Sequence, residues 1–323
     1  AAEALCATGL KRFPRDKDLL GNYIIALQAQ GKLSEALVCL EELLKHGRDV
    51  HFLETGAAIL NRLATAAGEQ DWGACVKYRK RALDLLLEAK QLNPRFVTAR
   101  FNLASTLFDL EQFRSAADEY WEVARLCGKK NTITDRAIEG VARILLEMGA
   151  PNESIKFCEK WMSEVGDVTE LTRSMSMALT ERHVVQDGKR IIICEAFEFF
   201  ENIVSTEKAH VEDFCYLADL YGRMDRFDEA KDTLKRAQER FPQNWLVPYY
   251  RGLVQHQAGQ SEAAIRSLEE ASRLAPFRSD PDWKLAQVYQ SLGNGQEADR
   301  LQKQSEAKKA QRKAIVDAEL TMV

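Results

Sequence analysis

Residues 214–242 read FCYLADLYGRMDRFDEAKDTLKRAQERFP, and residues 248–276 read PYYRGLVQHQAGQSEAAIRSLEEASRLAP. Each stretch ends in a proline, and the two prolines, Pro242 and Pro276, stand 34 residues apart. Small and large apolar residues precede both prolines at matching offsets. A period of this length is typical of chains built from repeated pairs of helices. Such an array offers an extended surface for holding a partner.

A small residue early in the second helix of each pair can be followed along the whole chain. It lets the paired helices approach closely. It occurs as Ala2, Ala36, Ala82, Ala116, Ser154, Ala196, Ala230, Ala264 and Ala298, in steps of 34, 46, 34, 38, 42, 34, 34 and 34 residues. The three longer steps predict two lengthened helices around 68–73, a longer loop at 128–134 and extra residues near 181–190.

The first helix of each pair has its own small position, and the turn that follows it often carries glycine. The small position is filled by Ile24, Ala104, Ala142, Ala218, Gly252 and Ala286, with Ala58 and Ser176 as weaker matches. Glycine takes the left-handed conformation that ends a helix. We therefore expect turns at Gly31, Gly149, Gly259 and Gly293.

These residues resemble the signature of the tetratricopeptide repeat family. The match is specific in Phe214–Pro242 and Gly252–Pro276 and weakest at 51–93 and 168–206, and it extends over almost the whole chain. The resemblance implies an all-α, right-handed superhelical solenoid of helical hairpins, with the first helices lining a concave face. It divides the chain, as a single continuous domain, into a half unit at 1–16, full units at about 17–50, 51–96, 97–130, 135–166, 168–208, 211–244, 245–278 and 279–298, and a capping helix at 299–323.

Composition narrows the class of protein and its surroundings. The 323 residues include 45 Lys and Arg against 49 Asp and Glu, a formal charge of −4. A general nucleic-acid binder normally shows a basic excess, so no nucleic-acid partner is expected. The seven cysteines contain no CxxC pair. We interpret them as small apolar residues of a reducing compartment, the cytoplasm, with disulfides between helices as the alternative.

The sequence contains no catalytic or cofactor motif. GxxxxGK[ST], GxGxxG after a strand, HExxH and GxSxG are all absent. The five histidines are scattered, and no cysteine or carboxylate set completes a metal site around them. We therefore expect no enzyme activity, no cofactor and no metal.

The resemblance places the binding residues on the exposed side of each first helix. Among them, asparagine can hold a peptide backbone through both the NH2 donor and the carbonyl acceptor of its side-chain amide, and aromatic residues are common anchors at interfaces. The predicted groove residues are Asn22, Asn102, Ser105, Arg143, Tyr216, Asp219, Tyr249, Tyr250, Trp283 and Lys284. The alternative for each is groove lining without a ligand, or packing between units for Trp283 and one tyrosine.

One subset of the family grips the carboxylate end of heat-shock chaperones. It needs lysine and asparagine in one unit, asparagine in the next, and then lysine and arginine. Here Cys215 and Asp219 replace the first pair, and around 97–143 Phe101 and Ser105 replace it. A cochaperone of this kind is disfavoured.

The leading functional hypothesis is a non-catalytic scaffold that binds a peptide or partner segment in the concave groove. Two alternatives stay open at this point. One is self-assembly into dimers or oligomers through the ends of the array. The other is RNA binding by a related array of helical hairpins. No stretch is long and apolar enough to span a membrane.

Overall fold

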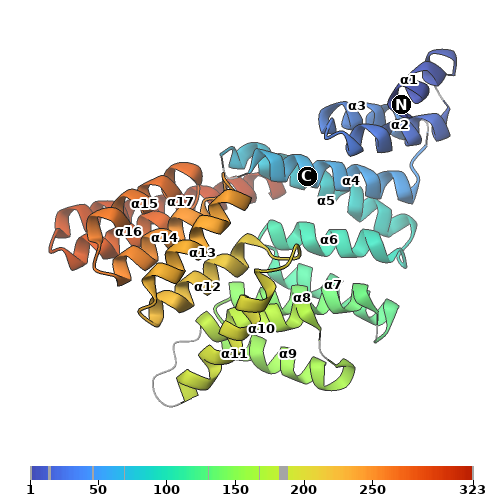
Figure 1. Ribbon diagram of the computed structural model, residues 1–323. Helices are drawn as coiled ribbons and strands as arrows, with labels where there is room; N and C mark the ends of the chain where they lie inside the picture. The colour runs from blue at the N-terminus through green and yellow to red at the C-terminus, as the bar shows by residue number, and fades with distance from the viewer. Residues whose placement is uncertain are drawn as a thin grey trace. The chain divides into compact units, whose positions relative to one another are not determined.

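The computed structural model describes residues 2–13, 16–45, 47–68, 70–129, 131–166, 168–181 and 188–321, and for 188–195 it describes the backbone alone. Within this described part every regular element is an α-helix, which confirms the predicted all-α fold (Figure 1). The helices are α1 (Ala2–Arg12), α2 (Lys17–Ala29), α3 (Leu33–Lys45), α4 (Val50–Ala67), α5 (Trp72–Leu92), α6 (Val97–Asp109), α7 (Phe113–Cys127), α8 (Thr132–Glu147), α9 (Pro151–Val165), α10 (Thr169–Glu181), α11 (Gly188–Ile203), α12 (Val211–Arg223), α13 (Phe227–Arg240), α14 (Leu246–Gln257), α15 (Ser261–Leu274), α16 (Asp280–Ser291) and α17 (Gly295–Thr321).

The chain forms two compact units. Unit 1 comprises Ala1–Ile144 and Ile315–Val323, and unit 2 comprises Leu145–Ala314. Helices α1 to α7 therefore belong to unit 1, and α9 to α16 belong to unit 2. The two boundaries fall within α8 and within α17.

Successive helices pack as hairpins in both units. In unit 1, α2 packs against α3 and α6 against α7; in unit 2, α12 packs against α13 and α14 against α15. The predicted small residues lie at these contacts and are almost completely buried, which allows the close approach. Their exposed fraction is 0% at Ala36, Ala82, Ala116, Ser154, Ala196, Ala230 and Ala264, and 5% at Ala298.

In each hairpin whose turn is described, a residue with positive φ follows the first helix. The four predicted glycines all have φ between 73° and 77°. At two turns a residue other than glycine takes this conformation: Glu111 with φ 59° and Asp225 with φ 57°. A left-handed residue with a Cβ atom is strained, because its side chain crowds the following carbonyl oxygen. The glycine pattern therefore located some of the turns, while two others depend on strained residues.

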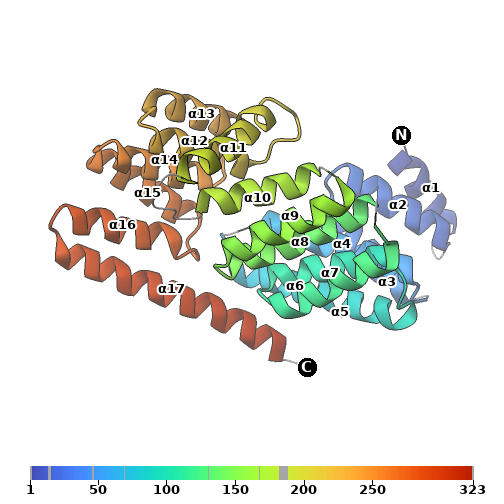
Figure 2. The same ribbon diagram turned by 90° about the horizontal axis from the view of Figure 1, so that it is seen from below.

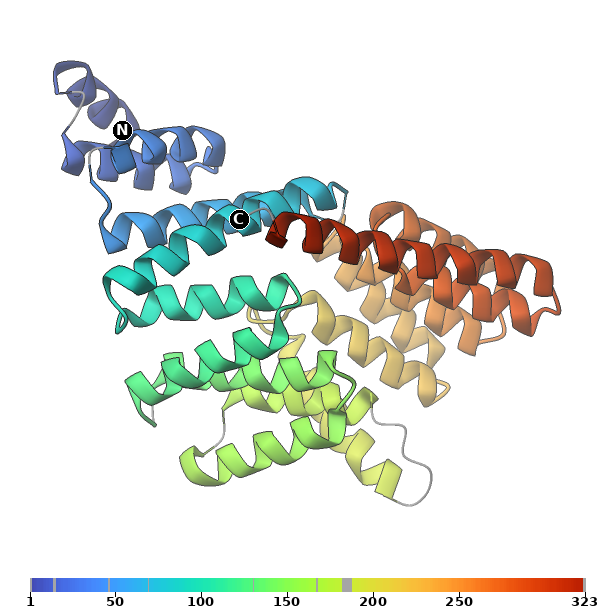
Figure 3. The same ribbon diagram turned by 180° about the vertical axis from the view of Figure 1, so that it is seen from behind.

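Both helices of the hairpin α4–α5 are long, as the 46-residue step predicted. Its helices have 18 and 21 residues and lie side by side (Figure 3). The small residue proposed at Ala58 is only partly buried, whereas Ala57 has no exposed surface. A Cβ atom on Gly56 would lie 2.5 Å from a methyl carbon of Leu40 and 2.9 Å from one of Leu85. The close contact therefore falls at Gly56 and Ala57, so the position assigned from sequence is wrong by one or two residues.

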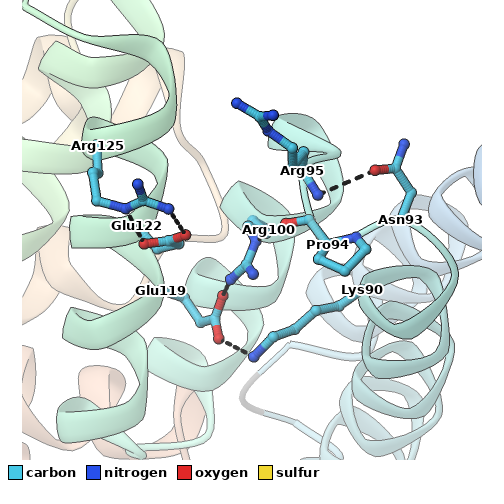
Figure 4. Close-up of polar contacts among 8 residues, drawn as sticks. All are labelled: Lys90, Asn93, Pro94, Arg95, Arg100, Glu119, Glu122 and Arg125. Atoms are coloured by element: carbon cyan, nitrogen blue, oxygen red, sulfur yellow. Dashed lines mark hydrogen bonds and ion pairs between the residues drawn. The ribbon is translucent and has the colours of Figure 1, made fainter.

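Unit 1 joins consecutive hairpins through a buried carboxylate. Glu119 of α7 accepts hydrogen bonds from Arg100 Nη1 at 2.6 Å and from Lys90 Nζ at 2.5 Å (Figure 4). The Nε atom of Arg100 also donates to the carbonyl oxygen of Pro94 at 2.5 Å. Because Arg100 and Glu119 are at most 9% exposed, their charges depend on each other for compensation. The cluster thereby connects α5, α6 and α7.

Unit 2 has two comparable clusters. Arg173 of α10 donates from Nε to Asp213 of α12 at 2.9 Å, and the other oxygen of Asp213 accepts from the His210 backbone at 2.8 Å. Further along the chain, Lys308 Nζ lies 2.6 Å from a carboxylate oxygen of Asp282, which is 1% exposed. This pair contributes to the docking of α17 alongside α16 (Figure 2).

The predicted boundaries between repeats stay predictions. Helix α17 runs from Gly295 to Thr321 without a break, so the proposed limit between the last unit and the capping helix, at residue 298, falls inside one helix. The proposed extra residues near 181–190 lie largely outside the described residues. Whether the repeats form one continuous domain is likewise a prediction.

Candidate functional site

Aromatic side chains form a packed layer beneath one face of unit 2. Tyr216 of α12 stacks on Phe200 with ring centroids 5.7 Å apart, and it contacts Tyr250 of α14 at 5.9 Å. Tyr249 contacts Tyr250 at 5.4 Å and Trp245 at 5.6 Å. Tyr216 is only 8% exposed. Burial raises the pKa values of Tyr216 and Tyr250 well above their ordinary range. These two tyrosines therefore lie beneath the face and present little surface to a partner.

Polar side chains of α10 and α12 lie on this aromatic layer and satisfy one another. The Tyr216 hydroxyl donates to Glu181 at 2.6 Å. Arg223 forms an ion pair with Asp219 at 2.6 Å and donates to the Thr180 carbonyl oxygen at 2.8 Å. Asp219 and Arg223 therefore compensate each other's charge.

The next two first helices extend this polar layer. Gln257, at the end of α14, donates from Nε2 to Asp219 at 3.1 Å. Lys284 of α16 is close enough to feel the charges of both Asp219 and Arg223. We call the surface formed by Glu181, Asp219, Arg223, Gln257, Trp283 and Lys284 the first-helix face of unit 2.

Lys284 differs from the other charges of this face. It is half-buried, and burial lowers the pKa of its ammonium; Asp219 opposes this shift and Arg223 adds to it. Its Nζ atom donates to Gln287 Oε1 at 2.9 Å and lies 5.4 Å from the ring centroid of Trp283. Among the described residues no carboxylate forms an ion pair with it. Lys284 is therefore a cation without a directly paired carboxylate among the described residues, although Asp219 lies near enough to affect its pKa.

Trp283 is the exposed aromatic residue of the face. Its exposed fraction is 49%, which is unusual for an indole. It borders a shallow hollow of about 460 Å³ between α16 and α17. The lining is mostly neutral, with several amide side chains: Trp283, Ala286, Gln287, Gln290, Ser291, Ala298, Asp299 and Gln302.

The predicted groove residues thus fall into two groups. The structure brings Tyr216, Asp219, Tyr249, Tyr250 and Lys284 together in unit 2, with Trp283 beside Lys284. The other four, Asn22, Asn102, Ser105 and Arg143, belong to unit 1. That all ten form one binding groove stays a prediction.

In unit 1 two of the predicted residues already have partners. Asn102 donates its amide to Glu54 at 2.6 Å, and Ser105 lies 3.1 Å from the Tyr120 hydroxyl.

The two remaining residues of that group are on the surface. Asn22 is exposed on α2, and the guanidinium of Arg143 lies 5.3 Å over the ring of Phe108.

Three polar residues of this region, Glu181, Gln290 and Gln302, are not among the predicted groove residues. A signal existed for Glu181, because it follows Ser176 by five residues, as Arg223 follows Ala218. It was overlooked because Ser176 is a weak match to the small position. Gln290 and Gln302 had no signal, since the hollow depends on how α17 packs against α16.

The described residues contain neither a group of metal ligands nor a membrane-spanning helix. No three His, Cys, Asp or Glu side chains are grouped closely enough to hold a metal ion. No helix in that part of the chain is sufficiently long and apolar to cross a membrane.

Comparison with known proteins supports a repeat architecture. A model of the tetratricopeptide repeat matches residues 217–282. No curated protein matches the chain. Solved structures match at low identity, and at this level the likeness shows the fold alone.

Three solved structures illustrate this likeness. The human IFIT1 dimer with m7Gppp-AAAA is 15% identical with a TM-score of 0.57, and the match covers 94% of this chain and 76% of that one. A tetratricopeptide repeat protein from Parabacteroides merdae is 13% identical with a TM-score of 0.52, covering 82% and 99%. A thermophilic TPR protein from Thermus thermophilus is 14% identical with a TM-score of 0.50, covering 59% and 98%. The resemblance to the tetratricopeptide repeat family is therefore confirmed, with the family model matching residues 217–282.

Proposed function

We propose that the protein is a non-catalytic interaction scaffold, and that it binds a peptide or partner segment on the first-helix face of unit 2. Tetratricopeptide-type arrays generally serve as scaffolds, and a surface that is formed before binding loses little ordering entropy. The cytoplasm stays the predicted location.

The observation that carries this proposal is the exposure of Trp283 next to an unneutralised lysine. Tryptophan is enriched among the few residues that dominate binding energy, because it gives a large contact area at low entropic cost. Here the ring is carried by helix α16, beside Lys284 and at the edge of the hollow between α16 and α17. Tyr216 and Tyr250 make the face rigid, because their rings pack in the core of unit 2.

A comparison of two exposed tryptophans tests the proposal. Short random peptides displayed on phage are selected on the wild-type protein and then tested on Trp283→Ala and Trp121→Ala. Trp121 is the matched control, because it is 45% exposed on α7 of unit 1. We expect Trp121→Ala to retain the selected clones and Trp283→Ala to lose them.

Clones that bind Trp283→Ala as well as they bind the wild type would contradict the assignment to this face. Tyr250→Ala is a poor test, because Tyr250 packs against the core of unit 2 and its removal is expected to damage the fold.

Self-association is the first alternative. One of the solved structures of similar fold is a dimer. Light scattering over a range of concentrations separates the two cases. A mass that doubles with concentration, together with the absence of any selected peptide, would favour assembly.

Single-stranded RNA is the second alternative, and unit 1 holds the feature that favours it. Arg136 lies 4.6 Å over Phe101 and Arg143 lies 5.3 Å over Phe108, one matched pair seven residues after the other. Guanidinium and aromatic planes are common in single-strand binding. The net charge of −4 opposes it. Retention of an oligoribonucleotide that weakens steeply with salt, and is lost in Arg136→Ala, would support RNA binding.

A further inference from the structure

Lys284 and the hollow between α16 and α17 together indicate which kind of ligand fits this face. We propose that the segment bound at the first-helix face is an acidic peptide, whose carboxylate pairs with Lys284 while a neighbouring apolar side chain covers Trp283 and the main chain continues into the hollow. This inference rests on the proposed function and specifies its ligand.

The first step of the argument is charge. A partly buried ammonium is unfavourable unless a counter-charge is near, because burial removes part of its hydration. Lys284 is half-buried, and within the described part of the chain its Nζ atom has the neutral amide of Gln287 as its hydrogen-bond partner, beside the Trp283 ring. The two nearby charges, Asp219 and Arg223, form their own ion pair. One negative charge from a ligand therefore completes the site, through a charge-assisted hydrogen bond.

The second step is the choice between one carboxylate and a polyanion. The face also carries Glu181 and Asp219, Asp280 opens the helix that bears Lys284, and Asp299 lines the hollow. These carboxylates repel a chain of phosphates. A nucleic acid also needs several cations in a row. The balance of charges at this face favours a peptide with an isolated acidic residue.

The third step is the hollow. Gln287, Gln290 and Gln302 present amide groups along its wall beside the indole of Trp283. A primary amide offers both donors and an acceptor, which suits the N–H and C=O groups of a peptide main chain. Its volume of about 460 Å³ is that of an ordinary ligand pocket. An acidic residue next to an apolar one would therefore engage Lys284 and Trp283 together, because Lys284 Nζ lies 5.4 Å from the ring centroid of Trp283.

The test uses the peptides selected on the wild-type protein. One selected peptide and its amide analogue, with Glu replaced by Gln or Asp by Asn, are titrated against the wild type, Lys284→Met and Lys284→Arg. Lys309→Met is the matched control, because it removes an exposed lysine of α17 that lines no part of the hollow. Circular dichroism verifies that each variant is folded.

We expect the selected peptides to contain an acidic residue beside an apolar one. The amide analogue should bind the wild type and Lys309→Met about tenfold more weakly, which corresponds to the loss of one charged hydrogen bond. Lys284→Met should bind both peptides equally, and Lys284→Arg should restore most of the difference.

Peptides without acidic enrichment, or an amide effect that persists in Lys284→Met, would overturn this inference and leave the proposed function standing. A library that yields no binder would overturn both. Binding of a single-stranded oligoribonucleotide that depends on Lys284 would overturn the peptide in favour of a nucleic acid.

Discussion

The first helices of unit 1 and unit 2 present polar residues at equivalent positions but use them differently. In unit 1, Asn102 is bonded to Glu54 of the preceding hairpin, and Asn61 donates to Thr106 at 2.8 Å. In unit 2, the corresponding surface ends in Lys284, for which the described residues provide no counter-charge. A repeat position therefore determines where a side chain lies but not whether it is available for a partner.

Aromatic residues show the same contrast. Tyr120 of unit 1 is buried against Gly140 and bonded to Ser105, and burial raises its pKa to about 12. Unit 2 also buries Tyr216 and Tyr250, but it adds Trp283, which stays half exposed. Unit 2 therefore has both a packed aromatic layer and a separate exposed indole. We take this difference as the reason to place the binding face in unit 2.

The largest expected effect concerns the buried charges that join the hairpins. Asp213→Ala in unit 2 leaves Arg173 buried without a counter-ion and removes the acceptor for the His210 backbone. We expect a loss of about 3–5 kcal/mol in the free energy of unfolding, measured by urea titration. Glu119→Ala in unit 1 should cost less, about 1–3 kcal/mol, because no backbone N–H loses its acceptor there; Arg100 keeps the Pro94 carbonyl oxygen, as Arg173 keeps that of Lys208.

Asp84→Ala is the control for this pair of variants. Its ion pair with Lys80 is on the surface, with 55% of the aspartate side chain exposed, so the loss should stay below about 1 kcal/mol. Equal losses at Asp213 and Asp84 would show that the clusters do not join the hairpins as described.

Two glycines at helix contacts sharpen the comparison next. A Cβ atom on Gly252 of unit 2 would lie 2.6 Å from Leu268 Cγ and 3.2 Å from the Ala264 carbonyl oxygen, whereas on Gly140 of unit 1 it would lie 2.5 Å from the ring of Tyr120. We expect each alanine substitution to destabilise the protein by about 1–3 kcal/mol. Gly252→Ala should be the more severe, since a backbone atom cannot move aside. Thermal unfolding followed by circular dichroism measures both, and a reversed order would contradict this packing.

The sequence predicts the helices well because each contact repeats the same small residue. The burial of Ala36, Ala230 and Ala264 follows from a step of 34 residues. The argument fails where the step changes, as at Ala58, since lengthened helices move the contact to Gly56 and Ala57. Helix periodicity locates the face of a side chain, and this is sufficient to find a core.

The candidate site is less predictable, for a physical reason. Whether Asn102 or Lys284 has a partner depends on residues far away in the sequence, such as Glu54 at a separation of 48. No local pattern records such a contact. Tyr216 is likewise predicted as an exposed anchor, but it is buried against Phe200. Its position in the repeat does not indicate that a large side chain lies next to it.

Substitutions at the turns should change stability by a smaller amount, with opposite sign in the two units. Gly31 of unit 1 and Asp225 of unit 2 occupy equivalent turns with φ of 73° and 57°. Gly31→Ala should destabilise by about 1 kcal/mol from strain alone, because no atom lies within 4 Å of the added carbon. Asp225→Gly should stabilise by about 0.5 kcal/mol, because the lost strain exceeds the added entropy of the unfolded chain. Destabilisation by Asp225→Gly in urea titration would show that its side chain, not its backbone, determines the turn.

The smallest expected effect is the pH dependence of stability that comes from Lys284. It tests directly whether the charge of Lys284 destabilises the folded protein. The pKa of Lys284 is lowered in the folded protein by burial. Below that pKa Lys284 is charged in both states, and burying the charge lowers the stability of the folded protein by the full amount. As pH rises toward 10.5, Lys284 loses its proton in the folded state first, so the unfolded chain binds more protons and the loss of stability becomes smaller. Lys284→Met should therefore be more stable than the wild type at neutral pH, and this advantage should shrink toward pH 10.5. The raised tyrosine pKa values act equally in both proteins and cancel in the difference. Urea titrations at several pH values measure this difference in the free energy of unfolding, with Lys309→Met as the reference. A difference that grows with pH would mean that a partner within the protein stabilises the charge of Lys284. The contrast drawn between unit 1 and unit 2 would then be wrong.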